Sequence, residues 1–549
     1  MQFSSPYIAA SWAFVAYVFY SIIARIITSR RIAKLSRDIG CEEPPMLKNK
    51  YPLGIDLAMR AIRADKNQIY PYDSILRTHQ VGAITYRMSM FSLKLLSTND
   101  EENIKAMLAV QFKDFEFGDC RKGSFWPLLG NGIFTQEGPS WEHSRAMLRP
   151  QFSREQISKL DLEETHVQNL MRSLDTLTPP NAQGWIEDVD LQELFFRLTL
   201  DLATEFLFGK SVDSQILLLE EQNDEFSKNL GLFAKAFDDA QLGLSKRSHF
   251  GDYYWLVWPK GFKESCKICH DFIDHYVRAA LERNPVKEKN NTDSDKKAYV
   301  FLDALVEETR DPIALRSQLL NVLLAGRDTT ASLLSWLFFL LSKDPVRYKK
   351  LRDIVLEEFG TYENPRDITF TRMKSCQYLQ YCNSETLRLY PSVPMNGRVA
   401  SKDTTLPRGG GKDGKSKIFV QKGTLIEYSV HVMHHRKDIW GEDAEEFNPE
   451  RWEGRKVGWE FLPVSLCPSS YLIHCRYYKA SFEMIIFNGG PRICVGQQFA
   501  LTEVSYVTIR LLQRFDMIHS NDMDPFVRHN MTLTNCNGRG VRVRAHAVC

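Results

Sequence analysis

The sequence predicts a mainly α-helical protein with a minor β part and one N-terminal transmembrane helix. Three observations predict this fold class. An uncharged apolar run, from Ile8 to Ala24, lies near the start of the chain. The longest apolar stretch, from Leu315 to Ser342, runs without a break. Strand patterns are confined to short segments, chiefly residues 417–430 and 540–548.

The N-terminal run has the composition of a membrane anchor. Its length is at the short end of what spans a bilayer, and Ile26 and Ile27 extend it. A cleaved signal peptide is the alternative, but it needs a positive start, and residues 1–7 carry no charged side chain. The proline-containing residues 41–52 then suit a stiff hinge. Basic residues follow the run at once and predict a cytosolic remainder: Arg25, Arg30, Arg31, Lys34 and Arg37.

Charge and cysteine usage argue against two classes of function. Lys and Arg together number 70 against 68 for Asp and Glu, a net charge of +2. The chain therefore has no basic surplus of the kind that suits nucleic acid. The 11 cysteines are scattered and odd in number, unlike those of a small secreted disulfide scaffold. We interpret most of them as reduced core residues.

The long apolar stretch predicts a central helix. Asp311 and Pro312 suit an N-cap and a first helical turn, and Lys343-Asp344-Pro345 ends the pattern. The stretch is apolar nearly all round, so we expect it to run through the middle of the fold.

A glycine-rich stretch, GGGKDGKS at residues 409–416, fits the pattern of a phosphate-binding loop. Such a loop needs a helix after it, whose N-terminus faces the anion. Here a strand pattern with a glycine turn follows Ser416. We therefore predict a hairpin tip and no ATP site.

Three further motifs have ordinary explanations. Cys266 and Cys269 precede His270 as in covalent haem attachment, but they share a helix face with Phe262 and Ile273, which indicates core packing. The sequons at Asn290 and Asn530 have no role in a cytosolic body. A histidine cluster has no cysteine or carboxylate partner at a metal-ligand spacing; its members are His431, His434 and His435.

A single cysteine near the C-terminus, Cys494, stands among glycines directly before an amphipathic helix pattern. A helix N-terminus favours the thiolate, and backbone N–H groups in such a loop can donate to the sulfur. Arg492 can face an anion on a ligand, and Phe487 can shield the sulfur from water. These residues suit a metal-binding thiolate and a glycine-rich turn with a buried cysteine equally well. The framing glycines are Gly489, Gly490 and Gly496.

The segment F-x-x-G-x-R-x-C-x-G, from Phe487 to Gly496, resembles the haem-ligand motif of the cytochrome P450 monooxygenases. Four other segments agree in the order of that family: the W-x-x-x-R helix at Trp141 and Arg145, the AGRDTT segment at residues 325–330, the E-x-x-R pair Glu385 and Arg388, and FNPERW at residues 447–452. These matches run from about residue 120 to the end of the chain.

The resemblance implies a large helical lobe and a small β-rich lobe, with haem b as cofactor and Cys494 as its axial thiolate. It implies haem-propionate contacts from Trp141, Arg145 and, less closely matched, Arg398. Phe487, Arg492 and Gly496 would complete the cofactor loop. Glu385, Arg388 and Arg451 would form a structural ion-pair cluster. We accordingly expect an anchor and hinge over residues 1–45 and a catalytic domain over residues 46–549.

The resemblance also assigns oxygen activation to Asp328 and Thr329. An axial thiolate favours O–O cleavage, and cleavage needs protons. Thr329 can position a water through its hydroxyl, Asp328 can bring protons from solvent, and Gly326 suggests a local opening of the helix. The alternative for Thr329 is a hydrogen bond back to the carbonyl four residues earlier.

Longer stretches, such as GIFTQEGPSWEHSRAMLRPQF, are similar to the fungal alkane-inducible subfamily. That similarity implies terminal hydroxylation of n-alkanes or long-chain fatty acids at the endoplasmic reticulum membrane. O2 and electrons from an NADPH–cytochrome reductase would be consumed. Apolar segments around Phe338, Val393 and Leu533 suit either a substrate channel or plain core.

The chain departs from the family pattern at residues 464–486, where VSLCPSSYLIHCRYYKASFEMII precedes the cysteine loop. Loop-closure entropy tolerates such an insert, but its position touches the loop that presents Cys494. We interpret it as a retained intron, an idea that transcripts carrying these codons would refute. Two alternatives to the enzyme stay open: a haem protein that only carries electrons or senses gas, and an inactive protein whose insert displaces Cys494.

Overall fold

The computed structural model describes residues 5–90, 93–216, 225–283, 299–455, 458–459 and 487–548. The chain divides into two compact units. One comprises Met1–Leu57, Arg77–Glu116 and Gly397–Tyr428, and the other comprises Ala58–Leu76, Phe117–Asn396 and Ser429–Cys549. The insert at residues 464–486 lies outside the described residues, and the expected boundary between residues 45 and 46 stays a prediction.

The first unit is built on a five-stranded sheet in the order β1-β2-β8-β5-β3. β1 runs antiparallel to β2, and β2 runs parallel to β8. Alternate residues of β1, Tyr86 and Met88, face a small apolar core with Leu47 and Leu95, as the two-residue period of a half-buried strand requires. The strands are β1 (Thr85–Met90), β2 (Leu93–Thr98), β3 (Phe115–Glu116), β5 (Met395–Ala400) and β8 (Leu425–Ser429).

The glycine-rich stretch at residues 409–416 is the tip of an antiparallel hairpin, as predicted. It joins β6 (Thr404–Gly410) to β7 (Ser416–Val420). The N–H of Gly409 donates to the carbonyl of Gly414 at 2.7 Å, and Gly411 and Gly414 take positive φ angles that favour glycine. A strand follows the tip, so this turn offers no helix N-terminus to a phosphate.

The stretch expected to be a hinge is tied into the first unit by backbone hydrogen bonds. Glu42 N–H donates to Lys417 O at 2.9 Å, and Leu47 N–H donates to Arg87 O at 2.9 Å. Residues 41–47 are therefore held along the sheet and the hairpin rather than left as a free linker.

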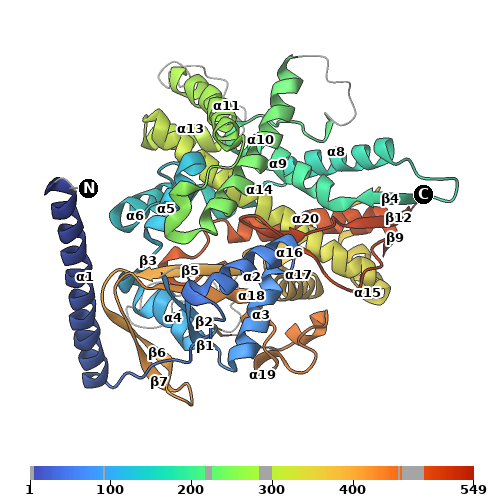
Figure 1. Cartoon of the computed structure of the whole chain (residues 1–549). Coiled ribbons are helices and arrows are strands. Elements are labelled where there is room, and N and C mark those ends of the chain that lie inside the picture. Colours follow the sequence, from blue (N-terminus) through green and yellow to red (C-terminus); the bar gives the residue numbers. More distant parts are fainter. Residues whose placement is uncertain are drawn as a thin grey trace, which may run out of the picture. The chain divides into compact units, whose positions relative to one another are not determined.

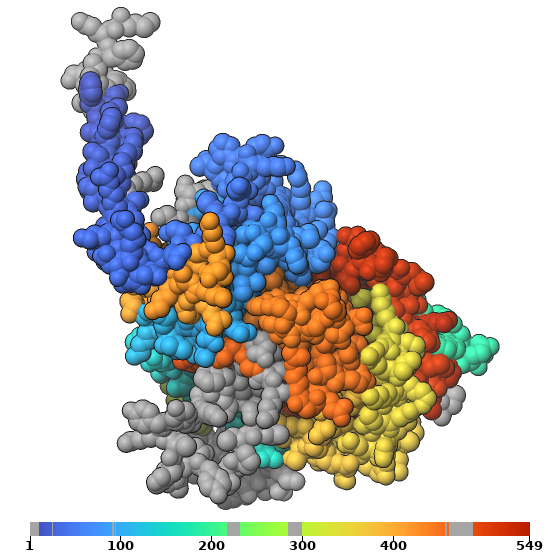
Figure 2. Space-filling view, turned by 90° about the horizontal axis from the view of Figure 1, so that it is seen from below, coloured from blue at the N-terminus to red at the C-terminus, as the bar shows by residue number. Residues whose placement is uncertain are grey.

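The N-terminal apolar run lies in helix α1 (Ser5–Asp38). Its part Ala10–Asp38 is long and apolar enough to cross a membrane, and none of its most apolar window is buried in the protein. Figure 2 shows its side chains uncovered on the face in view. Length and composition alone support a membrane span here.

The second unit is mainly helical and is organised around helix α14 (Pro312–Lys343). Asp311 caps this helix as predicted, since its carboxylate accepts the N–H of Ile313 at 2.9 Å. α14 contacts α9, α11, α17 and α20 (Figure 1). Twenty-two of its side chains are buried, which explains why its sequence is apolar on all faces.

Helix α4 (Glu101–Lys105) lies in the first unit. The other helices lie wholly or partly in the second unit. In chain order they are α2 (Ile55–Lys66), α3 (Tyr70–Val81), α5 (Gly118–Leu129), α6 (Gly138–Leu148), α7 (Arg154–Ile157), α8 (Asp161–Leu177), α9 (Leu191–Phe208), α10 (Glu225–Ser248), α11 (Phe262–Glu282), α13 (Phe301–Glu308), α15 (Pro345–Phe359), α16 (Phe370–Ser375), α17 (Gln377–Leu389), α18 (Val430–His434), α19 (Lys437–Trp440) and α20 (Gln497–Arg514).

Two small sheets complete the second unit. One has the order β4-β12-β9 and the other pairs β10 with β11. The C-terminal strand expected at residues 540–548 is β12. The strands are β4 (Trp185–Asp190), β9 (Phe515–Ser520), β10 (His529–Met531), β11 (Asn535–Asn537) and β12 (Arg542–Ala547).

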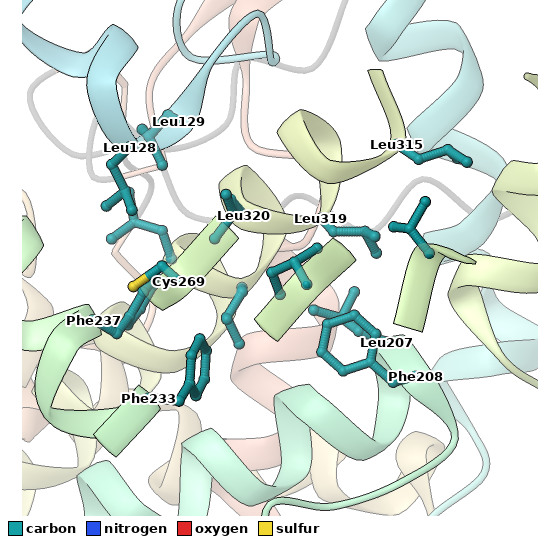
Figure 3. Close-up of a cluster of buried hydrophobic side chains, with 14 of the residues drawn as sticks. Leu128, Leu129, Leu207, Phe208, Phe233, Phe237, Cys269, Leu315, Leu319 and Leu320 are labelled. Carbon is teal, nitrogen blue, oxygen red and sulfur yellow. The ribbon is translucent and has the colours of Figure 1, made fainter. Parts of the chain in front are cut away.

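An apolar core lies between α14 and the helices α5, α9, α10 and α11 (Figure 3). Phe233 and Phe237 of α10 contribute to it together with Leu319 of α14. Cys266 and Cys269 are buried members of the same core. The prediction that the cysteine pair before His270 packs in the interior is therefore confirmed.

Polar side chains of α14 tie it to the segment before α6. The Asn321 amide donates to Leu129 O at 3.0 Å and accepts the N–H of Phe134 at 3.0 Å. The Gln318 amide donates to the Ser144 hydroxyl at 2.7 Å. Because Ser144 lies on α6 between Trp141 and Arg145, these bonds fix the helix that carries both residues.

Candidate active site

Cys494 lies in a tight loop that leads into helix α20. The 3₁₀ turn Gly490–Arg492 begins it, and Gly490 has a positive φ of 65°. The N–H of Cys494 donates to Phe487 O at 2.8 Å. This bond closes the loop, so the position of the sulfur is set by backbone geometry.

The surroundings of Cys494 shift the pKa of its thiol in opposite directions. Burial raises the pKa of its thiol, whereas the N–H of Gly496, the Arg145 guanidinium and the N–H of Gln497 lower that pKa. The sulfur-bearing side chain nevertheless keeps accessible surface, so a ligand can reach it. The N–H groups and the cation favour the thiolate form that binds metals.

Arg145 approaches the cysteine loop directly. Its Nη1 donates to the carbonyl of Ile493 at 2.6 Å, and burial lowers the pKa of its guanidinium. Trp141 is buried one turn earlier on α6, with the Arg145 guanidinium 5.8 Å from its ring centroid. The two residues predicted from W-x-x-x-R therefore lie beside the loop that holds Cys494.

Arg492 has a partner that the sequence did not reveal. Its guanidinium lies 4.3 Å from the Trp141 ring centroid, and it forms an ion pair with Glu137. Glu137 comes directly before the Gly138-Pro139 start of α6. An acidic residue next to a helix start was the only available signal, and it is common to many helices.

Phe487 and Gly496 are the other two loop residues predicted to complete the cofactor site. Phe487 is half-buried. A Cβ added at Gly496 would first meet the ring of Phe152, at 3.6 Å. A side chain larger than a methyl group at residue 496 would press against this ring.

Helix α14 has a half-buried stripe within its buried middle. Val322, Ala325, Gly326 and Thr329 are half-buried, while the residues between them are buried. The spacing i, i+3, i+4, i+7 places them on one face. A Cβ added at Gly326 would first meet Ala203 at 3.9 Å, so there is room for a methyl group at this point of the face.

Thr329 makes the alternative hydrogen bond that the sequence left open. Its Oγ1 donates to Ala325 O at 2.7 Å, and the carbonyl of Thr329 accepts from Ser392 Oγ at 3.2 Å. The first bond uses only the hydroxyl proton, so the oxygen lone pairs still accept from a water.

Asp328 is buried beside a cation. It is 2% exposed, and Arg327 Nη1 lies 3.3 Å from its Oδ1. Burial raises the pKa of its carboxyl to about 7, with a further increase from Asp238, although Arg327 and Gln241 act in the opposite direction. A carboxyl with this pKa exchanges protons near neutral pH.

Glu385, Arg388 and Arg451 are brought together in one buried cluster. Arg388 and Glu385 are both 0% exposed and form two parallel bonds of 2.9 Å. Arg451 Nε donates to Glu385 at 2.9 Å and its Nη2 pairs with Asp443 at 2.8 Å. Arg388 also donates to the carbonyls of residues 434, 444 and 446, so the cluster joins α17 to the following loop.

Arg398 lies in β5, in the first compact unit, and is buried. Its Nη1 donates to Gly397 O at 2.7 Å. Its expected contact with the cofactor stays a prediction.

The residues suggested for a substrate channel and the histidine cluster differ in burial. Phe338 is fully buried and packs against Phe195 with ring centroids 5.5 Å apart, so it is core, whereas Val393 and Leu533 are half-buried. The histidines of α18 and its C-cap are buried too, and burial lowers the pKa of His431, His434 and His435.

The residues present fit haem b. Cys494 is an accessible soft donor supported by backbone N–H groups, Arg145 supplies a half-buried cation beside it, and α14 supplies a face without charged side chains. Among the described residues no cluster of three or more His, Cys, Asp or Glu side chains could hold a metal ion by itself. A single thiolate donor with a planar cofactor suits this arrangement better than an all-protein metal site.

Comparison with known proteins identifies the family. The family model described as Cytochrome P450 matches residues 67–538. The chain is 54% identical over 547 residues to cytochrome P450 monooxygenase g430 of Fusarium sp, covering 99% of this chain and 91% of that protein. It is 44% identical over 522 residues to cytochrome P450 52A12 of Debaryomyces hansenii, covering 93% of each, and 46% identical over 475 residues to cytochrome P450 52A5 of Candida maltosa, covering 84% and 82%.

Members of this family use haem b, with an axial cysteine thiolate on its iron, O2 and electrons from a redox partner. The predicted resemblance is confirmed, and with it the fold of a helical lobe with a minor sheet part. The chain belongs to the cytochrome P450 family and is a haem-thiolate monooxygenase.

Proposed function

We propose that this monooxygenase hydroxylates the terminal carbon of n-alkanes or long-chain fatty acids. The observation that carries the proposal is the half-buried stripe of α14, whose members carry no charged group: Val322, Ala325, Gly326 and Thr329. An aliphatic chain loses no hydrogen bonds on reaching such a surface. The identity to relatives named cytochrome P450 52A supports the same substrate class.

Cys494 would hold the haem iron, with Trp141, Arg145 and Arg492 on the cofactor's acidic groups. The bound haem supplies oxygen activation driven by its electron-rich thiolate ligand. The backbone N–H groups of Gly496 and Gln497 stabilise that thiolate, because they donate to the charged form of the sulfur. With haem bound, Phe487 would shield the sulfur from water.

Asp328 and Thr329 serve proton delivery in this proposal. Asp328 holds a proton at its carboxyl near neutral pH. The Thr329 hydroxyl donates to Ala325 and accepts from a water, so it orients that water along the open face of α14. Together they pass protons toward the reacting oxygen.

Membrane attachment at the endoplasmic reticulum agrees with an apolar substrate. Helix α1 has the length and composition of an anchor. The connection between α10 and α11 exposes large apolar side chains, with Trp255 58% and Leu256 62% exposed. Aromatic residues suit a membrane interface. Electrons would come from an NADPH–cytochrome reductase in the same membrane.

Turnover of a substrate panel tests the proposal. The full-length protein with reductase should convert n-dodecane or lauric acid to the terminal alcohol, identified by gas chromatography and mass spectrometry. The reduced protein with carbon monoxide should show the thiolate absorption band, and Cys494→Ser should lose both the band and the product. A wild-type protein with the band but no product on any chain would indicate an electron carrier or sensor.

A further inference from the structure

Arg327 is shared by two carboxylates on α14 and α10. Its Nη1 lies 2.5 Å from Asp238 Oδ1 and 3.3 Å from Asp328 Oδ1. The exposed Asp238 therefore lies closer to the Arg327 guanidinium than the buried Asp328 does. The Arg327 side chain is 5% exposed, that of Asp328 3%, and that of Asp238 58%.

The guanidinium has little freedom to move away from either carboxylate. Its central carbon lies 5.2 Å from the ring centroid of Phe196 on α9 and 5.7 Å from that of Phe237 on α10. Rings on two helices thus hold the cation by cation–π contact. Without Asp238, the nearest remaining anion for Arg327 would be Asp328.

Two neighbours of Asp328 among the described residues, Gln241 and Cys536, are uncharged. The Gln241 side chain, on α10 and buried, hydrogen-bonds to its carboxyl. Cys536 of β11 lies within electrostatic range, and burial raises the pKa of that thiol to about 12, so it stays neutral. The protonation of Asp328 therefore depends on Arg327 and on Asp238, which competes with Asp328 for the Arg327 guanidinium.

We propose that Asp238 is a positioning residue for proton delivery, because it draws the Arg327 guanidinium toward the surface and leaves the buried Asp328 carboxyl able to take up and release a proton. This inference depends on the role of Asp328 in the proposed function. Without the competitor, Arg327 pairs fully with Asp328, and a fully paired carboxylate keeps its charge. Proton release to the active site then becomes rarer at a given pH.

Asp238→Asn tests this in the full-length holoprotein with reductase, beside Asp239→Asn as a control. Asp239 is the exposed neighbour on α10, and its substitution removes the same charge. The ratio of product to NADPH consumed is measured against pH. In Asp238→Asn, the pH at which this ratio falls on the alkaline side should be lower by about one unit. The solvent isotope effect on product formation should be larger in the same variant. In Asp239→Asn and Asp238→Glu the ratio should fall at the same pH as in the wild type.

An infrared pH titration gives a readout that does not depend on turnover. The carboxyl band that disappears in Asp328→Asn belongs to Asp328, and its midpoint should fall in Asp238→Asn. An unchanged midpoint, equal shifts in Asp238→Asn and Asp239→Asn, or loss of the carbon monoxide band in Asp238→Asn would each overturn the inference. If Asp328→Asn itself leaves coupling unchanged, the proposed role of Asp328 fails and the inference fails with it.

Discussion

The Thr329 hydroxyl donates one structural hydrogen bond, and its oxygen can still accept another. It donates to Ala325 O at 2.7 Å and lies on the half-buried face of α14. A threonine with only a structural role could make the same bond from a fully buried position. The two roles can be separated by substitution, because valine keeps the shape and removes only the oxygen.

Thr329→Val is expected to lower product formation by about 10²-fold, a magnitude typical of lost proton-transfer assistance. NADPH consumption continues, and its electrons appear as hydrogen peroxide. Thr386→Val on α17 is the matched control, because Thr386 makes the same backbone bond to Cys382 at 2.8 Å. Equal product yields from the wild type and Thr329→Val would remove Thr329 from the mechanism.

Two adjacent carboxyl groups on α8 have opposite surroundings. Glu163 is buried, and burial raises the pKa of its carboxyl from the ordinary 4.5 to about 7. Burial also raises the pKa of the neighbouring Glu503 of α20, and Glu163 raises it further. Glu164 instead accepts bonds from Arg510 at 2.9 Å and from Tyr506 at 2.7 Å.

The sign of the pH dependence follows from the raised pKa of Glu163. The folded protein binds its proton more tightly than the unfolded chain, so this contribution to stability is complete below pH 4.5 and is lost as pH rises through 7. Glu163→Gln mimics the neutral form. It should raise the thermal midpoint by about 2–4 °C at pH 8 and leave it nearly unchanged at pH 5.

Glu164→Gln serves as the counterpart in the same melting experiment. It removes a charged acceptor from Arg510, which costs about 1.5–3 kcal/mol, so the midpoint should fall at both pH values. A Glu163→Gln protein that loses stability at pH 8 would show that the buried carboxyl is held by a cation after all.

At the scale of elements, the Glu385–Arg388–Arg451 cluster joins α17 to the loop that precedes the insert at residues 464–486. Arg388 uses its planar guanidinium for two bonds to Glu385 and for three backbone carbonyls. Lysine has a single nitrogen and cannot reproduce this geometry. The charge of residue 388 is therefore less important than its shape.

Arg388→Lys is expected to destabilise the protein by about 3–5 kcal/mol, because it keeps the charge but leaves several buried acceptors without a donor, at about 1–3 kcal/mol each. Haem content per chain and the thermal midpoint should both fall. Arg366→Lys is the control, since Arg366 also donates to carbonyls but is exposed. If Arg388→Lys keeps full haem content and its midpoint, the cluster does not hold the fold.

At the scale of the whole molecule, the orientation in the membrane decides which surface faces the reductase. Basic residues after the apolar run of α1 predict that the body is cytosolic. Asn530 offers an internal test, because it is exposed in β10 and begins the sequon Asn-Met-Thr.

Asn530 is expected to stay unglycosylated in the native membrane, because glycosylation occurs on the lumenal side. Treatment with a glycosidase should leave the mobility of the protein on a gel unchanged, while a sequon added before residue 1 should be modified. Glycosylation at Asn530 would reverse the proposed orientation.

Removal of residues 1–40 deletes the predicted anchor. Most of the shortened protein should then be released from membranes by alkaline carbonate, because its remaining apolar contacts with the membrane lie at the membrane surface.

The sequence by itself determined the family, the central helix and its cap, the hairpin at residues 409–416 and the core role of Cys266 and Cys269. These depend on local periodicity, turn chemistry and short motifs. Only the tertiary structure decided the partners: Glu137 for Arg492, Asp238 for Arg327 and the carbonyls around Arg388. Pairs of charges far apart along the chain leave no local pattern, because an ion pair depends on distance in space and not on spacing in sequence.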